Sequence, residues 1–310
     1  MASNDIRNED LDLGAALFSA FLCVLFGANA VAIKVSLMGL GPFTTAGLRF
    51  SLAAALIFLW VLATGRQIGF SRTQLRPLLV LSLIFASQLS LFYLGLSRTN
   101  ASRGTLLANL QPFFTLFLAH FFIPGDQITR RKFFGILMGF SGVACVFMEK
   151  QGGGTGDLRI GDLIILAATF LWAINAVYIK RVINRFEPHQ IVMYQMIFAV
   201  PIFFAEAFLW DRPMIFQLDT KVISALLYQS VITAAFGFLA WTYLLRRYGT
   251  VALHSFIFIM PIAGVVLGGI VLNEPITGKI LLALGFIVAG ILTVHFKPEK
   301  RLVPFTFYKG

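Results

Sequence analysis

The chain alternates long apolar runs with short polar segments, and this pattern continues from Leu13 to about residue 296. The runs have the roughly 17 to 25 residues that an α-helix needs to cross the hydrocarbon layer of a membrane. They lack the short alternation of barrel strands, and unpaired backbone groups cannot stay in hydrocarbon, so we expect helices. The pattern predicts an all-α integral membrane protein with ten transmembrane helices. The expected spans lie near residues 13–35, 43–63, 77–97, 104–123, 133–148, 160–180, 190–210, 222–245, 250–272 and 279–296.

The composition indicates that lipid is the solvent of this chain. Of its 310 residues, 58% are hydrophobic and 13% are charged, whereas roughly a quarter of the residues in soluble domains are charged. The 33 phenylalanines and a mean hydropathy of +0.84 exclude a soluble enzyme. Cys23 and Cys145 both lie inside apolar runs, so neither a disulfide nor a metal framework is expected.

The formal net charge is +11, and the positions of the basic residues decide what this charge means. With the N-terminus inside, the inner segments hold about twice as many Lys and Arg residues as the outer segments. This bias predicts a protein of the cell inner membrane with both termini in the cytoplasm. Because the basic residues occupy short loops at one membrane face, their expected partner is anionic membrane lipid rather than nucleic acid.

An internal repeat divides the chain into two similar halves. The segment from Asn29 to Lys34 in the first expected helix matches the segment from Asn175 to Lys180 in the sixth. A glycine-rich stretch over residues 152–156 has the composition of a flexible linker between the halves. The expected units are therefore 1–150 and 151–310, each with five helices, which together form one membrane domain. Further matches follow in the same order, namely Pro42 with Pro188, Pro112 with Pro261, and Gly142 with Gly290.

The odd number of helices in each half forces the second copy to enter the membrane from the opposite side. Two inverted five-helix repeats are typical of secondary transporters, whose halves exchange conformations and open a central cavity to each face in turn. An intramembrane scaffold or enzyme is the alternative from a different class. The sequence contains no phosphate-binding loop, zinc spacing or nucleophile triad, so we expect no cofactor, no metal, no enzyme activity and no ATP-driven transport by this chain alone.

The sequence resembles the EamA type of the drug/metabolite transporter superfamily over nearly its whole length. The resemblance rests on helix-start prolines, an Arg-Phe pair, prolines in the fourth helix of each half, and acidic-x-x-Thr turns. It implies a ten-helix fold of two five-helix units and transport of a small solute, with export as the direction. Small single-copy relatives exchange protons through a glutamate in the first helix, but the stretch from Leu13 to Lys34 contains no carboxylate. The residues that carry the resemblance are Pro42, Arg49, Phe50, Pro112, Asp126, Pro188, Pro261 and Glu274.

Three basic residues are candidates for charge recognition or gating. Arg49 is the only cation expected well within a span, where insertion costs roughly 2 to 3 kcal/mol or more. It either attracts an anionic or carboxylate group or serves structurally by capping carbonyls or reaching the surface. Lys34 and Lys180 are gating cations or anchors of helix ends, and Gln195 takes the place of Arg49 in the second half.

The fourth helix of each half is the expected wall of the cavity. Thr105, Asn109 and Pro112 are spaced four and three residues apart, which places a hydroxyl, an amide and a kink on one helix face. His254 and Pro261 are expected in the corresponding ninth helix. The prolines predict kinks that expose backbone carbonyls, whereas the alternative for Asn109 and His254 is an ordinary interhelical contact.

Polar and aromatic side chains within the spans complete the candidate substrate site. Trp and Tyr residues near span ends can equally be interfacial anchors. Glu206 is the one carboxylate expected clearly inside a span; it either reaches the headgroups or couples transport to protons. Glycine pairs such as Gly135 with Gly139 permit close helix packing, and they leave monomer and homodimer open. The substrate-binding candidates are Asn29, Gln88, Tyr93, Asn109, Trp172, Asn175, Trp241, Tyr243 and His254.

The charges around the expected cavity favour one class of small-molecule substrate. Without a well-buried carboxylate, the desolvation of an organic cation would go uncompensated. A neutral, zwitterionic or anionic solute is favoured, and an amino acid or related amphipathic solute fits best. A hydrophobic drug or a lipid-linked sugar is the alternative within the same fold.

Overall fold

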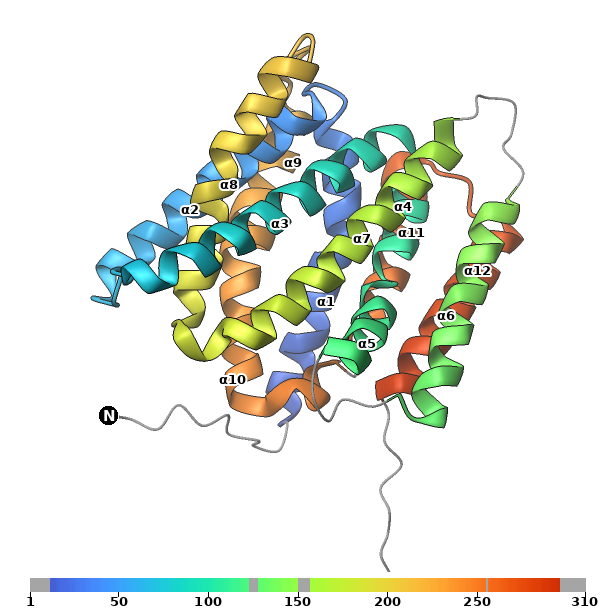
Figure 1. Cartoon of the computed structure of the whole chain (residues 1–310). Helices are drawn as coiled ribbons and strands as arrows, with labels where there is room; N and C mark the ends of the chain where they lie inside the picture. The colour runs from blue at the N-terminus through green and yellow to red at the C-terminus, as the bar shows by residue number, and fades with distance from the viewer. Residues whose placement is uncertain (1–11, 123–127, 150–156, 255, 296–310) are drawn as a thin grey trace, which may run out of the picture.

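The computed structural model describes residues 12–122, 128–149, 157–254 and 256–295, and Figure 1 shows helices stacked in one bundle. The α-helices are α1 (Leu13–Ser36), α2 (Pro42–Ala63), α3 (Arg72–Arg98), α4 (Ala101–Ala108), α5 (Gln111–Phe122), α6 (Arg130–Met148), α7 (Asp157–Val182), α8 (Pro188–Trp210), α9 (Thr220–Leu227), α10 (Phe238–His254), α11 (Ile259–Leu272) and α12 (Gly278–His295). A 3₁₀ turn, η1 (Ile183–Arg185), follows α7, and a π-helix, η2 (Tyr228–Gly237), joins α9 to α10.

Within the described residues, eight helical segments are long and apolar enough to cross a membrane, and α11 and α12 are shorter apolar helices. Large apolar side chains cover the outside of the bundle; Phe208, for example, is 75% exposed and Phe134 is 60% exposed. Such a surface would aggregate in water but is stable in lipid. The prediction of an all-α integral membrane fold is confirmed.

Two of the expected spans are broken rather than kinked. The fourth span is interrupted at Asn109 and Leu110, and Pro112 is the second residue of the new helix α5. The expected ninth span, 250–272, is wrong at its start, because α10 continues to His254 and α11 begins at Ile259. Proline has no N–H and is best tolerated in the first turn of a helix, so Pro112 and Pro261 lie just after each break.

Corresponding helices of the two halves cross antiparallel, which is the geometry of an inverted repeat. On α2 and α8, the ring of Phe43 lies 5.6 Å from that of Trp210, whereas further along, Phe50 lies 5.6 Å from Phe203. Residue numbers therefore rise on one helix as they fall on the other. The same reversal holds for α6 with α12, which lie side by side at one edge of Figure 1, and for α4 with α11.

Glycines allow these antiparallel pairs to approach closely. A Cβ on Gly135 of α6 would lie 2.9 Å from the carbonyl oxygen of Gly290 on α12. A Cβ on Gly264 of α11 would lie 2.3 Å from the Thr105 side chain on α4. The glycine pairs singled out in the sequence thus serve helix packing within this chain.

Carboxylates of the second half hold helix ends of the first half at the end of the bundle where α1 meets α2, which is the top of Figure 1. Glu274 accepts hydrogen bonds from the backbone N–H groups of Ala101 (2.6 Å) and Ser102 (2.8 Å) at the start of α4. Asp211 accepts one from the N–H of Thr44 (2.7 Å) near the start of α2. Both carboxylates satisfy N–H groups that a helix leaves unpaired. The corresponding Asp126 turn lies outside the described residues.

Candidate functional site

Arg49 of the first half lies in the middle of a buried polar network that also includes residues of the second half. It projects from α2 and is only 3% exposed. Its Nη1 donates a hydrogen bond to the Tyr93 hydroxyl (3.0 Å), and its Nη2 donates one to Thr233 Oγ1 (3.2 Å). The guanidinium carbon lies 4.9 Å from the centre of the neighbouring Phe50 ring. Two hydroxyl groups and an aromatic ring therefore surround the charge.

The network extends from Arg49 to α1 through the π-helix. Tyr93 Oη donates to Gln229 Oε1 (3.0 Å), and Gln229 Nε2 donates to Ser36 Oγ (2.6 Å). The Thr233 hydroxyl lies 3.0 Å from Asn29 Oδ1 and 2.7 Å from the Gln229 carbonyl oxygen, either of which can accept its hydrogen. The structure thus brings together Asn29, Arg49 and Tyr93, three residues that the sequence analysis selected.

The sequence analysis missed three residues of this network, namely Ser36 of α1 and the two residues that contact Tyr93 and Arg49 directly. Gln229 and Thr233 lie on η2, where the expected eighth span was an ordinary helix. A π-helix is rare and is frequently found at functional sites. The signal was present in the sequence as Gln229, Ser230 and Thr233 within an otherwise apolar run, but nothing in that run marks the change of helix type.

The charge on Arg49 has no counter-charge among the residues that the structure describes. The ion pair found in the described structure joins Arg103 to Asp162, and Arg49 Nε is buried without a hydrogen-bond partner there. A guanidinium carries five N–H donors in a fixed fork. A buried charge normally needs a partner of opposite sign, because the interior repays little of its lost hydration. The site therefore offers a positive charge with an unused donor.

The second half contains a simpler version of the same arrangement. Gln195 of α8, which corresponds to Arg49, donates from Nε2 to Asn175 Oδ1 of α7 at 3.2 Å. Both side chains are buried. Asn29 and Asn175 thus occupy equivalent positions, but a cation is present in only one half.

Trp172 and Gln88 lie near this region without joining the network. The Trp172 ring lies edge-on to Phe92, with ring centres 6.1 Å apart, and Phe92 contacts Tyr93 in turn. Gln88 on α3 is buried, and its Oε1 has no hydrogen-bond partner within the described structure. Gln88 therefore keeps an acceptor free inside the bundle.

The remaining predicted residues lie elsewhere. Asn109 donates from Nδ2 to the Thr105 carbonyl oxygen (2.8 Å) at the end of α4, and Lys34 Nζ donates to the Leu96 carbonyl oxygen (2.9 Å) at the end of α3. Lys180 is exposed in the last turn of α7. Asn109 and Lys34 therefore bind helix ends.

The aromatic candidates of the eighth span also fall outside the network. Trp241 packs against Phe26 of α1, with ring centres 6.0 Å apart, and Tyr243 is 62% exposed on the surface. His254 closes α10 rather than standing in the ninth span beside Pro261. His254 and Pro261 do not share a helix face, because α10 ends at His254 and α11 begins at Ile259.

A buried ion pair is the largest electrostatic feature that the sequence analysis missed. Arg103 comes just before the expected span 104–123, and Glu206 was the one carboxylate expected clearly inside a span. In the structure, Arg103 of α4 and Asp162 of α7 are 4% and 0% exposed and form a salt bridge. Arg103 Nε lies 3.1 Å from Asp162 Oδ2, and Thr99 Oγ1 donates to Oδ1 at 2.7 Å. Both residues come early in their helices, so the sequence gives no sign that they meet.

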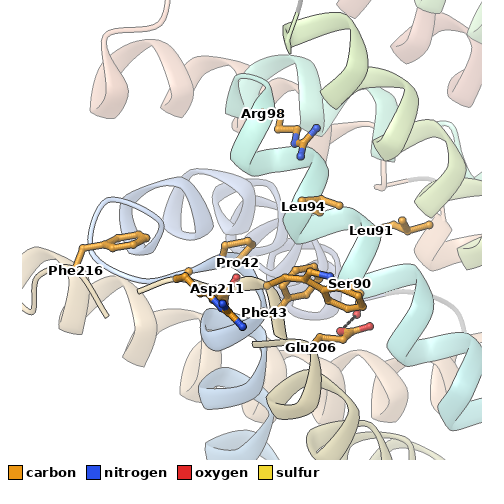
Figure 2. A pocket seen from close by; sticks show the side chains of 12 residues that line it. Pro42, Phe43, Ser90, Leu91, Leu94, Arg98, Glu206, Asp211 and Phe216 are labelled. Carbon is orange, nitrogen blue, oxygen red and sulfur yellow. Dashed lines mark hydrogen bonds between the residues drawn. The ribbon is translucent and has the colours of Figure 1, made fainter. Parts of the chain in front are cut away.

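A cavity of about 620 Å³ opens between α2, α3 and α8 at the top of the bundle. Figure 2 shows Glu206 and Ser90 at one end of the cavity and Arg98 at the other. From α2 the lining includes Pro42 and Phe43, and Arg49 lies six residues beyond Phe43, which is about 9 Å of helix rise. Arg49 does not line this cavity in the present conformation.

Known proteins are similar to this chain over nearly its whole length. A model of the EamA-like transporter family matches residues 13–148 and, a second time, residues 159–296. The chain belongs to the EamA-like transporter family. The two matches coincide with the two antiparallel halves seen in the structure.

Several relatives of this EamA-like transporter span nearly the same length. One is the "Uncharacterized transporter YvbV" of Bacillus subtilis, which is 26% identical over 92% of this chain and 93% of its own. Another is the "Probable amino-acid metabolite efflux pump" of Escherichia coli, which is 27% identical over 89% of this chain and 92% of its own. A solved crystal structure with 17% sequence identity covers 91% of this chain and 97% of its own with a TM-score of 0.67, which shows the shared fold.

Proposed function

We propose that this EamA-like transporter is a secondary carrier of the cell inner membrane that exports an amino acid or a related amphipathic solute by alternating access. Arg49 is the anchor for the carboxylate of the solute. The observation that carries the proposal is the buried Arg49 guanidinium, which has an unpaired Nε and no carboxylate partner in the described residues.

Physical chemistry supports a carboxylate as the group that Arg49 holds. A guanidinium presents parallel N–H groups that match the two oxygens of a carboxylate. In the present conformation the hydroxyls of Tyr93 and Thr233 stand in for those oxygens. Each hydroxyl also has a second partner within the network, so a solute carboxylate can displace it from Arg49 without leaving it unpaired.

The antiparallel halves support alternating access. Arg49 contacts Thr233, and Tyr93 contacts Gln229, so the network joins the two halves. A relative movement of the halves changes the access to Arg49 because its partners come from both of them. The amino-acid metabolite efflux named for one relative agrees with the proposed solute class and direction.

Counterflow in proteoliposomes tests the solute class directly. We expect labelled amino acids to exchange, whereas their carboxylate-blocked esters and decarboxylated amines exchange at least about 30-fold more slowly, because a buried charged pair contributes roughly 2–5 kcal/mol. Sugars, lipid-linked sugars and quaternary ammonium drugs complete the panel. Exchange confined to the ammonium drugs or to the lipid-linked sugars would refute the proposal.

The orientation has its own test in a cysteine-free background. Gly69, in the segment before α3, has open space where a side chain would begin, and Leu218 before α9 is exposed. We expect G69C to react with a membrane-impermeant thiol reagent only from the cytoplasmic side and L218C only from the outer side, as the distribution of basic residues requires. Reversed labelling would show that both termini lie outside.

A further inference from the structure

Glu206 is a carboxylate inside a membrane span that the carboxylate-binding site does not use. It lies on α8, one turn before the helix ends at Trp210. Its Oε2 accepts a hydrogen bond from the Ser90 hydroxyl on α3. A residue that merely reached for the headgroups would point away from the bundle, whereas Figure 2 shows Glu206 directed to Ser90 within the cavity.

The groups that face Glu206 leave its charge weakly compensated. Arg98 of α3 lines the same cavity two turns beyond Ser90, and Figure 2 shows it at the far end from Glu206. The exposed Arg212 lies past the end of α8, and α2 contributes Pro42 and Phe43 to the lining. No ion pair to Glu206 occurs in the described residues, and α10 contributes nothing to this lining.

The second acid of the cavity, Asp211, has a structural task. Its Oδ2 accepts hydrogen bonds from the N–H (2.7 Å) and the Oγ1 (2.8 Å) of Thr44 near the start of α2. Burial raises the pKa of Asp211, and the Thr44 bonds oppose that rise. Two donors and a helix N-terminus stabilise the negative charge of Asp211, so this side chain serves to bind the start of α2. Its charge also disfavours a second negative charge on Glu206 in the same cavity.

We propose that Glu206 is the proton-binding residue that couples this carrier to the proton gradient, with the cavity between α2, α3 and α8 as its route to water. The rim of the cavity includes exposed residues such as Arg98 and Phe216, so a proton from the adjacent solution can reach the carboxylate. The carboxylate takes up this proton as Oε–H, which removes a charge that is costly at membrane depth. This inference rests on the proposed function as a solute carrier.

Two contacts link Glu206 to the solute site. Ser90, its partner, lies one turn from Tyr93 on α3, and Tyr93 binds Arg49. Phe203, one turn earlier on α8, stacks on Phe50 beside Arg49. Protonation replaces a charge-assisted hydrogen bond between α3 and α8 by a weaker neutral one. Since α3 and α8 belong to different halves, the loss of charge loosens a contact that must change when the halves move.

The test compares E206Q with E187Q, a carboxylate at the other end of the same helix, in proteoliposomes. Counterflow at equal pH reports solute exchange, and a pH-sensitive dye reports solute-dependent proton flux. A one-unit pH difference permits about tenfold accumulation for one proton per solute. We expect the parent protein and E187Q to approach this accumulation, and E206Q to lose it together with proton flux while its counterflow stays within about twofold.

Each result has one consequence. Proton flux that persists in E206Q overturns the proposal, and so does robust counterflow without proton flux in the parent protein, which leaves the carrier function standing. Absence of counterflow for every solute in the parent protein refutes the carrier function instead. If E206Q loses counterflow as well, E206D decides: restored proton flux supports Glu206 as the proton site, and a folded, solute-binding E206D without flux overturns it.

Discussion

Replacing Asp162 by Asn is expected to lower the free energy of unfolding by about 3–5 kcal/mol, because the substitution leaves a buried guanidinium without its partner. Arg103 is 4% exposed and gives its hydrogen bonds to Asp162 from Nε and Nη2. Asp162 also accepts a hydrogen bond from Thr99 at the end of α3. One substitution therefore weakens the contacts that α7 makes with both α3 and α4. Reversible unfolding in mixed micelles with increasing denaturing detergent measures the change.

The matched control for D162N is R159M, which removes an exposed charge one turn away on the same helix. We expect R159M to change the free energy of unfolding by less than about 0.5 kcal/mol. The double variant R103M/D162N should recover much of the loss, since no buried charge remains unpaired. Equal stability of D162N and the parent protein would show that the pair contributes nothing.

Replacing Arg49 by Gln is expected to reduce amino-acid counterflow by about 30-fold or more, the equivalent of at least 2 kcal/mol of lost charge pairing. R49K keeps the charge but loses the fork of N–H groups, so its counterflow should fall between those of R49Q and the parent protein. The control R72Q removes an exposed arginine at the start of α3 and should leave counterflow unchanged.

Stability separates the two possible roles of Arg49. In R49Q the Tyr93 and Thr233 hydroxyls keep their other partners, and a buried, unpaired charge disappears, so the free energy of unfolding should fall by less than about 1 kcal/mol. D162N and R49Q thus have opposite profiles, the first losing stability and the second losing transport. A large loss of stability in R49Q would instead make Arg49 a structural residue.

The expected positions of the helices were accurate wherever apolar length alone decides them. The first, second and seventh spans agree with α1, α2 and α8 to within a few residues. The breaks near residues 109 and 256–258 were less well predicted, because Pro112 and Pro261 indicate a disturbance but not whether the helix bends or ends. The π-helix was not predicted, because the same residues serve an α-helix equally well.

The candidate site was predicted in part. Asn29, Arg49 and Tyr93 could be chosen because a polar or charged residue within an apolar span needs a partner. Gln229 and Thr233 were not chosen, since they follow Arg49 by about 180 residues and nothing local pairs them with it. Tyr243 shows the opposite error, as an aromatic residue in a span can equally face lipid.

By itself the sequence determined the solvent of this chain, its helical class, its duplication and the inversion of its halves. These properties follow from apolar run length, the odd helix number and an internal match, all of which are local or additive along the chain. Tertiary structure alone decided which charges meet. Arg103 forms a buried salt bridge with Asp162. Arg49 instead donates hydrogen bonds to two hydroxyl groups, and its Nε has no partner in the described structure. The reason is physical: the stability of a charge at membrane depth depends on groups within a few ångströms, and those groups come from helices far apart in the chain.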